Sequence, residues 1–172
     1  KYSGENTMAL GIIYESILRW IPPAKIISAV GNIFTNKALD PELKQVVNIE
    51  IPDYLLVQME MENGIRGSFN ISEVSLHAPI PTIQIHGTHG SMKIEFIPNG
   101  KLWYGSKTDT VLQEVKFESQ DNSYWRVEEE FINAIRGKEN VSMTTFDSGV
   151  NYMRFTQAVM DSYREHGNLK YL

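Results

Sequence analysis

His77 is the histidine whose sequence context best suits a functional site. It lies in the segment 75–79, which interrupts an alternating strand pattern, and loops carry functional residues more often than strands do. An imidazole can give or take a proton near neutral pH, so we treat His77 as a candidate for proton transfer. The plainer interpretation, an ordinary loop histidine, stays open.

Other common catalytic chemistries lack their residues in this chain. There is no cysteine, which excludes disulfides, thiolate catalysis and Cys-ligated zinc. His86 and His89 straddle a tight turn, and no H-E-x-x-H pattern occurs, so we expect no metal site. No Gly-x-Ser-x-Gly elbow prepares a nucleophilic serine. No G-x-G-x-x-G unit occurs either, so this segment alone is not expected to bind a dinucleotide.

Composition limits the possible partners and the number of domains. With 172 residues, 42% of them hydrophobic, we expect a single domain spanning 1–172. The net charge is −5 and the basic residues are scattered, which makes nucleic acid an unsuitable partner. No apolar run approaches the roughly 20 residues of a membrane span, and the cytoplasm is the expected location. The first six residues, without a starting Met or a signal peptide, suggest a cut made inside a longer chain.

Helical and strand periodicities divide the chain into an ordered series of elements. Apolar residues in 10–21 recur with helical spacing, and Pro22-Pro23 ends that helix. A strand is expected over 25–34, followed by two hairpins, the first turning at Asn63-Gly64. The second hairpin pairs 82–86 with 91–96, and further strands are expected at 102–104 and 111–117.

The end of the chain returns to helical periodicity. An apolar stripe from Tyr124 to Ile135 predicts one helix, with the acidic run 128–130 on its solvated face. A second helix is expected from Thr144 or Thr145 to about His166, and a short strand over 169–172. Three aromatic residues could stack on a sugar, although core packing is the favoured interpretation: Trp103, Tyr104 and Trp125.

This order of elements predicts an α+β fold, in which an open, mostly antiparallel β-sheet has its helices packed on one face. A domain of this size has no second layer for the other face of the sheet. We therefore expect that face to meet another domain or a second subunit, and a homo-oligomer is the simplest outcome.

Several phrases of the sequence resemble the Gfo/Idh/MocA oxidoreductases, the family named for glucose-fructose oxidoreductase and inositol dehydrogenase. The segment 83–92 is similar to the family's I-x-G-x-x-G, and the hairpin through Gly64 and Gly67 is similar to its N-G-x-x-G strand pair. The segment 130–138 resembles its F-x-x-A-I-x-x-G, and 147–167 resembles its closing helix. The matches keep the family's order from about residue 8 to the end.

The resemblance implies a dihydrodipicolinate reductase-like C-terminal domain from a two-domain enzyme. The missing N-terminal half would be a Rossmann domain that binds NAD or NADP and carries the catalytic lysine. The C-terminal half would shape the site for a sugar, polyol or cyclitol and build homo-oligomers through its open sheet. The resemblance implies no cofactor-binding residue in this segment.

One expected catalytic feature departs from the family pattern. Many members carry G-x-H-x-x-D followed by Arg, where His exchanges a proton with the substrate hydroxyl and Asp orients it. Gly11 and Arg19 match this frame, but Ile13 occupies the His position and Ser16 the Asp position. An isoleucine cannot transfer a proton.

Three explanations follow. The enzyme uses another group, such as Tyr14, Glu15 or His77; or the chain has lost its activity; or the register differs by one, which places Tyr14 in the His position. Tyr14 also fits the apolar stripe, so core packing is the competing role.

The sequence thus supports three hypotheses. The first is the substrate-side domain of an NAD(P)-dependent oxidoreductase acting on a sugar or cyclitol hydroxyl, with Tyr14 or His77 as catalytic candidates and Glu15, Ser16 and Arg19 at the substrate. The second is a catalytically silent binding or assembly domain of the same fold. The third is an unrelated α+β binding domain.

Overall fold

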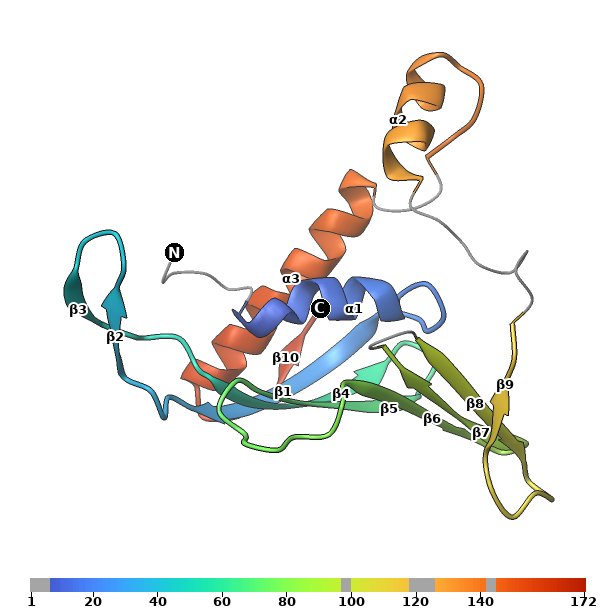
Figure 1. Cartoon of the computed structure of the whole chain (residues 1–172), viewed down its shortest axis with the longest axis horizontal. Helices are drawn as coiled ribbons and strands as arrows, with labels where there is room; N and C mark the ends of the chain where they lie inside the picture. Colours follow the sequence, from blue (N-terminus) through green and yellow to red (C-terminus); the bar gives the residue numbers. More distant parts are fainter. Residues whose placement is uncertain (1–6, 97–99, 118–125, 142–144) are drawn as a thin grey trace. The chain divides into compact units, whose positions relative to one another are not determined.

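A computed structural model describes residues 7–96, 100–117, 126–141 and 145–172. Its strands pair only with antiparallel neighbours, and its helices complete an α+β fold (Figure 1). Two compact units divide the chain: one contains residues 1–75 and 128–172, and the other residues 76–127. The expected fold class, antiparallel sheet with helices, is therefore confirmed.

The first unit is built on a four-stranded sheet. Its strands are β1 (Ala24–Asn32), β4 (Tyr54–Met61), β5 (Arg66–Ser72) and β10 (Lys170–Tyr171), in the order β10-β1-β4-β5. The turn between β4 and β5 uses Gly64, whose φ of +83° lies in the left-handed region that a residue without Cβ enters freely. The predicted Asn-Gly hairpin is confirmed.

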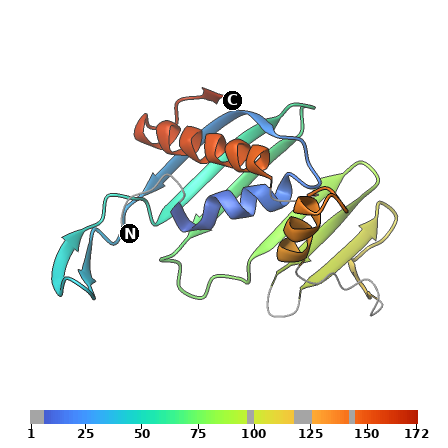
Figure 2. The ribbon, with the colours of Figure 1, turned by 90° about the horizontal axis from the view of Figure 1, so that it is seen from above.

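Two helices cover one face of this sheet (Figure 2). They are α1 (Leu10–Ile17), preceded by the short turn η1 (Thr7–Ala9), and α3 (Phe146–Arg164). Alternate residues of β1 and β4 point into the layer between, where Ile27, Leu55 and Val57 have no exposed surface. The core of the unit is completed from α1 and α3 by Leu10, Tyr14, Phe155 and Val159.

The ends of the helices follow their capping residues. Thr145 caps α3, because its hydroxyl accepts a hydrogen bond from the amide of Ser148 at 3.1 Å. The helical segment terminates at Gly167, as expected, and the φ of this glycine is +92°. Helix α1 is shorter than expected: regular helix stops at Ile17, and tighter turns carry the chain to Ile21 before the prolines.

The other face of the sheet has no covering layer within the unit. Val30 and Leu56, opposite one another on β1 and β4, are 47% and 38% exposed. Further along β4, Glu60 binds Lys25 at 3.0 Å and Arg66 at 2.7 Å. This face of the sheet therefore carries both apolar and charged side chains, as non-obligate protein–protein interfaces do.

A hairpin absent from the sequence-based expectations joins β1 to β4. Its strands are β2 (Lys37–Asp40) and β3 (Gln45–Asn48), and it projects from the end of the sheet (Figure 1). Asp40 shapes the turn by accepting hydrogen bonds from the amides of Glu42 and Leu43. The Asp-Pro pair at the turn was the available signal, but four-residue strands are too short for a clear period.

Asp53 fixes the base of this hairpin, and its removal tests that anchor. Its carboxylate accepts hydrogen bonds from the amides of Phe34 at 2.9 Å and Thr35 at 2.7 Å. Partial burial raises the pKa of Asp53, but these hydrogen bonds outweigh that effect and hold the pKa below its ordinary value of 3.8. We expect Asp53→Asn to lower the free energy of unfolding by about 1 kcal/mol at neutral pH.

The pH dependence has a defined sign. Because the folded-state pKa is depressed, the contribution of Asp53 is complete above about pH 4 and is lost as the pH falls through the folded pKa. Urea unfolding at pH 7 and at pH 3 measures this. The gap between wild type and Asp53→Asn should narrow at the lower pH, and a gap independent of pH would contradict the assignment.

The described part of the second unit forms a four-stranded sheet. It contains β6 (Thr82–Gly87), β7 (Gly90–Glu95), β8 (Lys101–Ser106) and β9 (Gln113–Val115), in that order. Cross-strand partners separate the faces: Ile83, Ile94 and Leu102 share one, and Gln84, Lys93 and Trp103 share the other. The expected alternation is confirmed, while β9 is shorter than the expected strand 111–117.

Helix α2 (Val127–Ile135) begins close to the predicted position, although Tyr124 and Trp125 lie outside the described residues. Glu128 and Glu129 are exposed, as expected. The apolar stripe, which the sequence assigned to packing, is exposed as well: Phe131 is 61% and Ile135 72% exposed.

Candidate functional site

Tyr14 is a core residue in this fold. It is 2% exposed, its ring stacks on Phe155 with centroids 3.6 Å apart, and its hydroxyl accepts a hydrogen bond from the amide of Ala24 at 2.8 Å. Burial raises the pKa of the phenol above its ordinary value of 10, the bond from Ala24 lowers it, and nearby Glu62 raises it further. At neutral pH the phenol is therefore protonated, and its oxygen is already hydrogen-bonded to the backbone of β1. Both features match the core role considered for Tyr14.

Three polar residues lie on α1 or just beyond its end: Glu15 and Ser16 on the helix, and Arg19 two residues after it. Glu15 is 8% exposed and binds the guanidinium of Arg19 through both oxygens, at 3.2 and 3.1 Å. Ser16 is half-buried and donates its hydroxyl to the carbonyl of Ile12 at 2.9 Å. Helical spacing brings these residues together, since positions three and four apart share a face.

This cluster can bind but has no free base. The carboxylate of Glu15 is already neutralised by Arg19, and Ser16 can turn its hydroxyl from the backbone to a ligand at small cost. Arg19 keeps 42% of its side chain exposed, which leaves donors for a hydroxyl or carboxylate. Ile13, in the position of the family's histidine, is half-buried beside them.

His77 lies in an exposed turn at the start of the second unit, with φ +55°. Non-glycine residues adopt this conformation rarely, and histidine is among those that tolerate it. Within the described part of the chain, no hydrogen bond or ion pair holds its imidazole. Tyr14, Glu15, Ser16 and Arg19 belong to the first unit, and His77 belongs to the second.

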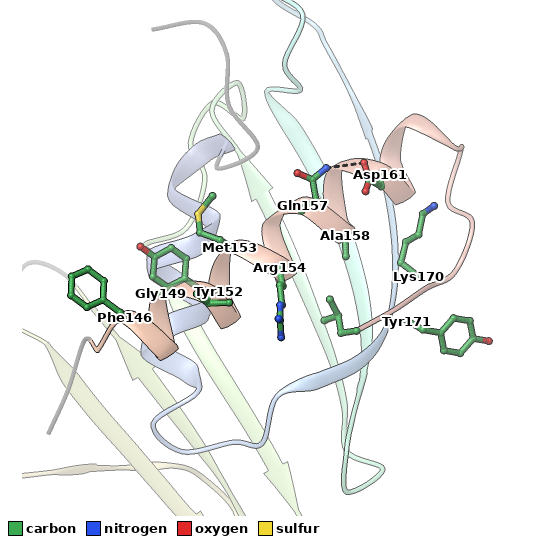
Figure 3. A pocket seen from close by; sticks show the side chains of 12 residues that line it. Phe146, Gly149, Tyr152, Met153, Arg154, Gln157, Ala158, Asp161, Lys170 and Tyr171 are labelled. Atoms are coloured by element: carbon green, nitrogen blue, oxygen red, sulfur yellow. Dashed lines mark hydrogen bonds between the residues drawn. The ribbon is translucent and has the colours of Figure 1, made fainter. Parts of the chain in front are cut away.

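A shallow groove of about 840 Å³ runs between α3 and the end of the chain (Figure 3). The sequence-based candidates do not line it. Its apolar part includes Phe146, Val150 and Met153 on the helix, Tyr171 on β10 and the terminal Leu172, and its rim carries Arg154, Asp161 and Lys170. The signal that could have found it is the apolar spacing at 146, 150 and 153, which continues on the side of α3 away from the core.

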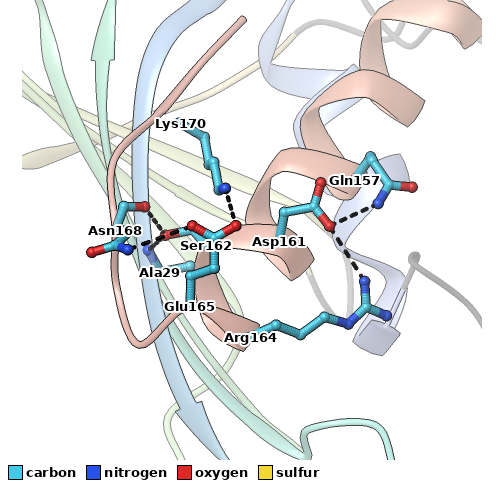
Figure 4. Close-up of polar contacts among 8 residues, drawn as sticks. All are labelled: Ala29, Gln157, Asp161, Ser162, Arg164, Glu165, Asn168 and Lys170. Atoms are coloured by element: carbon cyan, nitrogen blue, oxygen red, sulfur yellow. Dashed lines mark hydrogen bonds and ion pairs between the residues drawn. The ribbon is translucent and has the colours of Figure 1, made fainter.

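Polar contacts join the end of α3 to β1 and to the turn that follows the helix (Figure 4). The buried hydroxyl of Ser162 accepts from the amide of Ala29 at 2.8 Å and donates to the carbonyl of Asn168 at 2.7 Å, which ties helix, β1 and C-terminal turn together. Lys170 pairs with Glu165, and this hydrogen bond lowers the pKa of the Glu165 carboxyl.

The second unit displays an aromatic residue between two ammonium groups. Lys93 and Lys101 lie 5.0 and 5.7 Å from the ring centre of Trp103, at cation–π distance. Each lysine also pairs with a carboxylate, Glu95 at 2.7 Å and Glu114 at 3.2 Å. The hydrogen bond from Lys93 lowers the pKa of Glu95. Trp103 is half-buried among these charges and does not belong to the core cluster of the first unit.

Two general features concern the described residues as a whole. They contain no group of three or more His, Asp or Glu side chains placed to hold a metal ion. None of their helices is long and apolar enough to cross a membrane.

Comparison with known proteins identifies the fold. Residues 28–170 match the family described as "Oxidoreductase family, C-terminal alpha/beta domain", the C-terminal domain of the Gfo/Idh/MocA group. No curated protein sequence matches this chain.

Solved structures with the same fold include dehydrogenases bound to NADH. Levoglucosan dehydrogenase in complex with NADH and L-sorbose superposes with a TM-score of 0.78 at 17% identity, covering 98% of this chain and 50% of its own. The WlbA dehydrogenase from Bordetella pertussis, in complex with NADH and UDP-GlcNAcA, gives 0.69 at 16% identity, covering 99% and 45%. An oxidoreductase domain protein from Kribbella flavida gives 0.78 at 14% identity, covering 98% and 51%.

This chain thus spans about half the length of the solved structures that it matches. At such identities the superpositions establish the fold, and the family match over most of the chain establishes its kinship. The sequence phrases at 83–92 and 130–138, strands β4 to β9 and the closing helix α3 all fall within the matched residues. The chain belongs to the Gfo/Idh/MocA oxidoreductases, as their C-terminal α/β domain.

Proposed function

We propose that this chain is the substrate-side domain of an oxidoreductase that transfers a hydride between NAD or NADP and a hydroxyl of a sugar, polyol or cyclitol. The single observation that carries the proposal is the family match over 28–170. Structures of the same fold are twice as long and were solved with NADH and sugar-type ligands. The parent protein would accordingly contain an N-terminal dinucleotide-binding half.

The residues of this chain do not fit a dinucleotide. Nowhere in the 172 residues does a G-x-G-x-x-G turn connect a strand to a helix, and such a turn is what brings backbone amides to a pyrophosphate. We therefore assign cofactor binding to the other half, and derive only substrate contacts from the residues present here.

Ser16 and Arg19 are the proposed substrate contacts in the first unit. Ser16 lies on α1 and Arg19 lies two residues beyond its end, and their hydroxyl and guanidinium can bind sugar oxygens. Glu15 holds Arg19 in place through its two-oxygen contact, so we propose a positioning role for Glu15. Tyr14 fixes α1 against α3 by stacking on Phe155.

His77 is the proposed proton-transfer group. Of the three candidates, the Tyr14 hydroxyl is occupied by the backbone of β1 and the Glu15 carboxylate by Arg19. His77 alone of the three has an exposed side chain whose imidazole nitrogens have no hydrogen-bond partner among the described residues. The alternative function, a catalytically silent binding or assembly domain, is favoured by Ile13 in the position of the family's histidine.

The uncovered face of the first unit's sheet is the proposed surface for pairing with a second copy. Val30 and Leu56 are exposed apolar residues of this face, and the Glu60 ion pairs lie four residues further along β4. A substitution such as Leu56→Asp places a charge in the proposed contact, which should separate the two copies without touching the core on the opposite face.

The assay that tests the function uses the full-length parent protein with NAD or NADP and a panel of sugars, polyols and inositols. Formation of reduced nicotinamide, followed by its absorbance, is the expected result. A parent that binds the cofactor but turns over no member of the panel would favour the silent assembly domain. A parent whose upstream half lacks both the Gly-rich turn and a catalytic lysine would contradict the proposal.

A further inference from the structure

Helix α3 carries two apolar stripes, and only one of them is used by the core. The inner stripe includes Phe155 and Val159, which have no exposed surface. The outer stripe, defined here as Phe146, Val150 and Met153, follows the spacing i, i+4, i+7 and is 96%, 49% and 44% exposed. This is the spacing that lets one helix pack along another.

The outer stripe forms one side of the groove seen in Figure 3. Tyr171 and Leu172, 74% and 48% exposed, continue the apolar surface past the end of the helix. With ordinary side-chain areas of about 150–250 Å², these five residues expose roughly 600 Å². Two copies that cover the surface therefore remove about 1,200 Å² from solvent before the polar rim is counted, which reaches the size of specific interfaces.

The charges beside the stripe favour one orientation. Asp147 and Arg154 are seven residues apart, two turns along the same flank of α3. Both are exposed, and within the described part of the chain neither takes part in an ion pair. When two such helices run antiparallel, the same flank of each faces the other, so Asp147 of one copy meets Arg154 of the second, twice across a two-fold axis.

We propose that α3 of this protein pairs antiparallel with α3 of a second copy, with Val150 packed against Met153 of the second copy and the two Asp147–Arg154 pairs at the edges. This interface lies on α3 and β10, away from the uncovered sheet face. Together with pairing through the sheet it would generate a tetramer of dihedral symmetry.

Light scattering of the full-length parent tests the interface. Val150→Asp buries a charge in the apolar centre and should halve the mass of the assembly, with at least a tenfold rise in the dissociation constant. Leu39→Asp, on the β2–β3 hairpin, is the matched control because Leu39 is also exposed, at 67%, and lies outside α3. A monomeric wild type, or a mass unchanged by Val150→Asp, would overturn the proposal.

Charge exchange tests the antiparallel orientation. Asp147→Arg and Arg154→Asp each place like charges together and should weaken the assembly about tenfold, while the double exchange should restore it. Circular dichroism checks that α3 is intact, because Asp147 also lies in its first turn. Failure of the double variant to recover, with the helix intact, would rule out the antiparallel pairing.

Disulfide formation locates the contact, because this chain has no cysteine of its own. A mixture of Val150→Cys and Met153→Cys parents should form the mixed disulfide in preference to either symmetric one, as mass spectrometry of the linked peptides would show. A link from either position to the dinucleotide-binding half of the same chain would instead assign the groove to that half.

The proposed α3 pairing rests on the proposed function in one respect only, namely that the full-length parent is a two-domain protein that contains this chain. Leu56→Asp distinguishes the two proposed interfaces, because it should abolish pairing through the sheet face and leave pairing through α3 intact. A parent that turns over substrate but does not pair through α3 contradicts the inference alone, and one that pairs but shows no turnover contradicts the oxidoreductase alone.

Discussion

Phe155→Ala should lower the free energy of unfolding by about 3–5 kcal/mol, which is a large share of a domain's total stability. The ring has no exposed surface, stacks on Tyr14 at 3.6 Å and meets Phe69 edge-on at 6.0 Å. Its loss leaves a cavity at the point where α1, α3 and the sheet meet. Urea unfolding of the wild type and the variant, followed by far-ultraviolet circular dichroism, measures the difference.

The same helix supplies the control for this prediction. Phe146→Ala removes the same kind of ring from a residue that is 96% exposed. In a monomeric sample, the free energy of unfolding of this variant should therefore differ from that of the wild type by less than about 0.5 kcal/mol. Equal losses for the two variants would mean that Phe155 is not packed as described. The comparison also separates the core stripe of α3 from the outer stripe.

His77→Ala in the full-length parent should lower kcat by about 10²–10⁴-fold, the usual contribution of a positioned proton-transfer group. Added imidazole should restore part of the rate, because it supplies the missing base without repairing any structure. His77→Gln, which keeps a polar side chain of similar size but cannot exchange a proton, should be as slow as His77→Ala.

Tyr14→Phe distinguishes catalysis from packing. Loss of the hydroxyl leaves the amide of Ala24 buried without a partner, which should cost about 1–3 kcal/mol of stability. The kcat of the folded variant should stay close to that of the wild type. A loss of kcat in Tyr14→Phe comparable with that of His77→Ala, at full foldedness by circular dichroism, would instead place the proton-transfer group on α1.

Sequence patterns were sufficient to predict those elements that are determined by residues close together in the chain. The Asn63-Gly64 hairpin, the alternation in β6 and β7 and the Thr145 cap of α3 all depend on residues close together in the chain. Side chains one turn or one strand-pair apart determine these features, so their spacing is visible in the sequence. The family phrases are local in the same sense, which is why they indicated the fold correctly.

Tertiary packing decided the roles of individual side chains. Tyr14 fits both a catalytic frame and an apolar stripe, and only the position of Phe155, 141 residues away, shows which role the fold gives it. Val150 and Met153 are apolar residues at helical spacing in the sequence, yet the inner stripe of α3 fills the layer over the sheet and leaves them exposed. The β2–β3 hairpin likewise depends on Asp53, which reaches back to Phe34.

The sequence by itself determined the class of fold, the family and the absence of a dinucleotide turn, because short-range spacing and composition carry that information. The tertiary structure decided which polar groups are occupied and which surfaces are left over. Glu15 is neutralised by Arg19, the Tyr14 hydroxyl completes the backbone of β1, and the outer stripe of α3 stays uncovered. Burial and hydrogen-bond partners come from contacts between distant segments, and no local pattern specifies them.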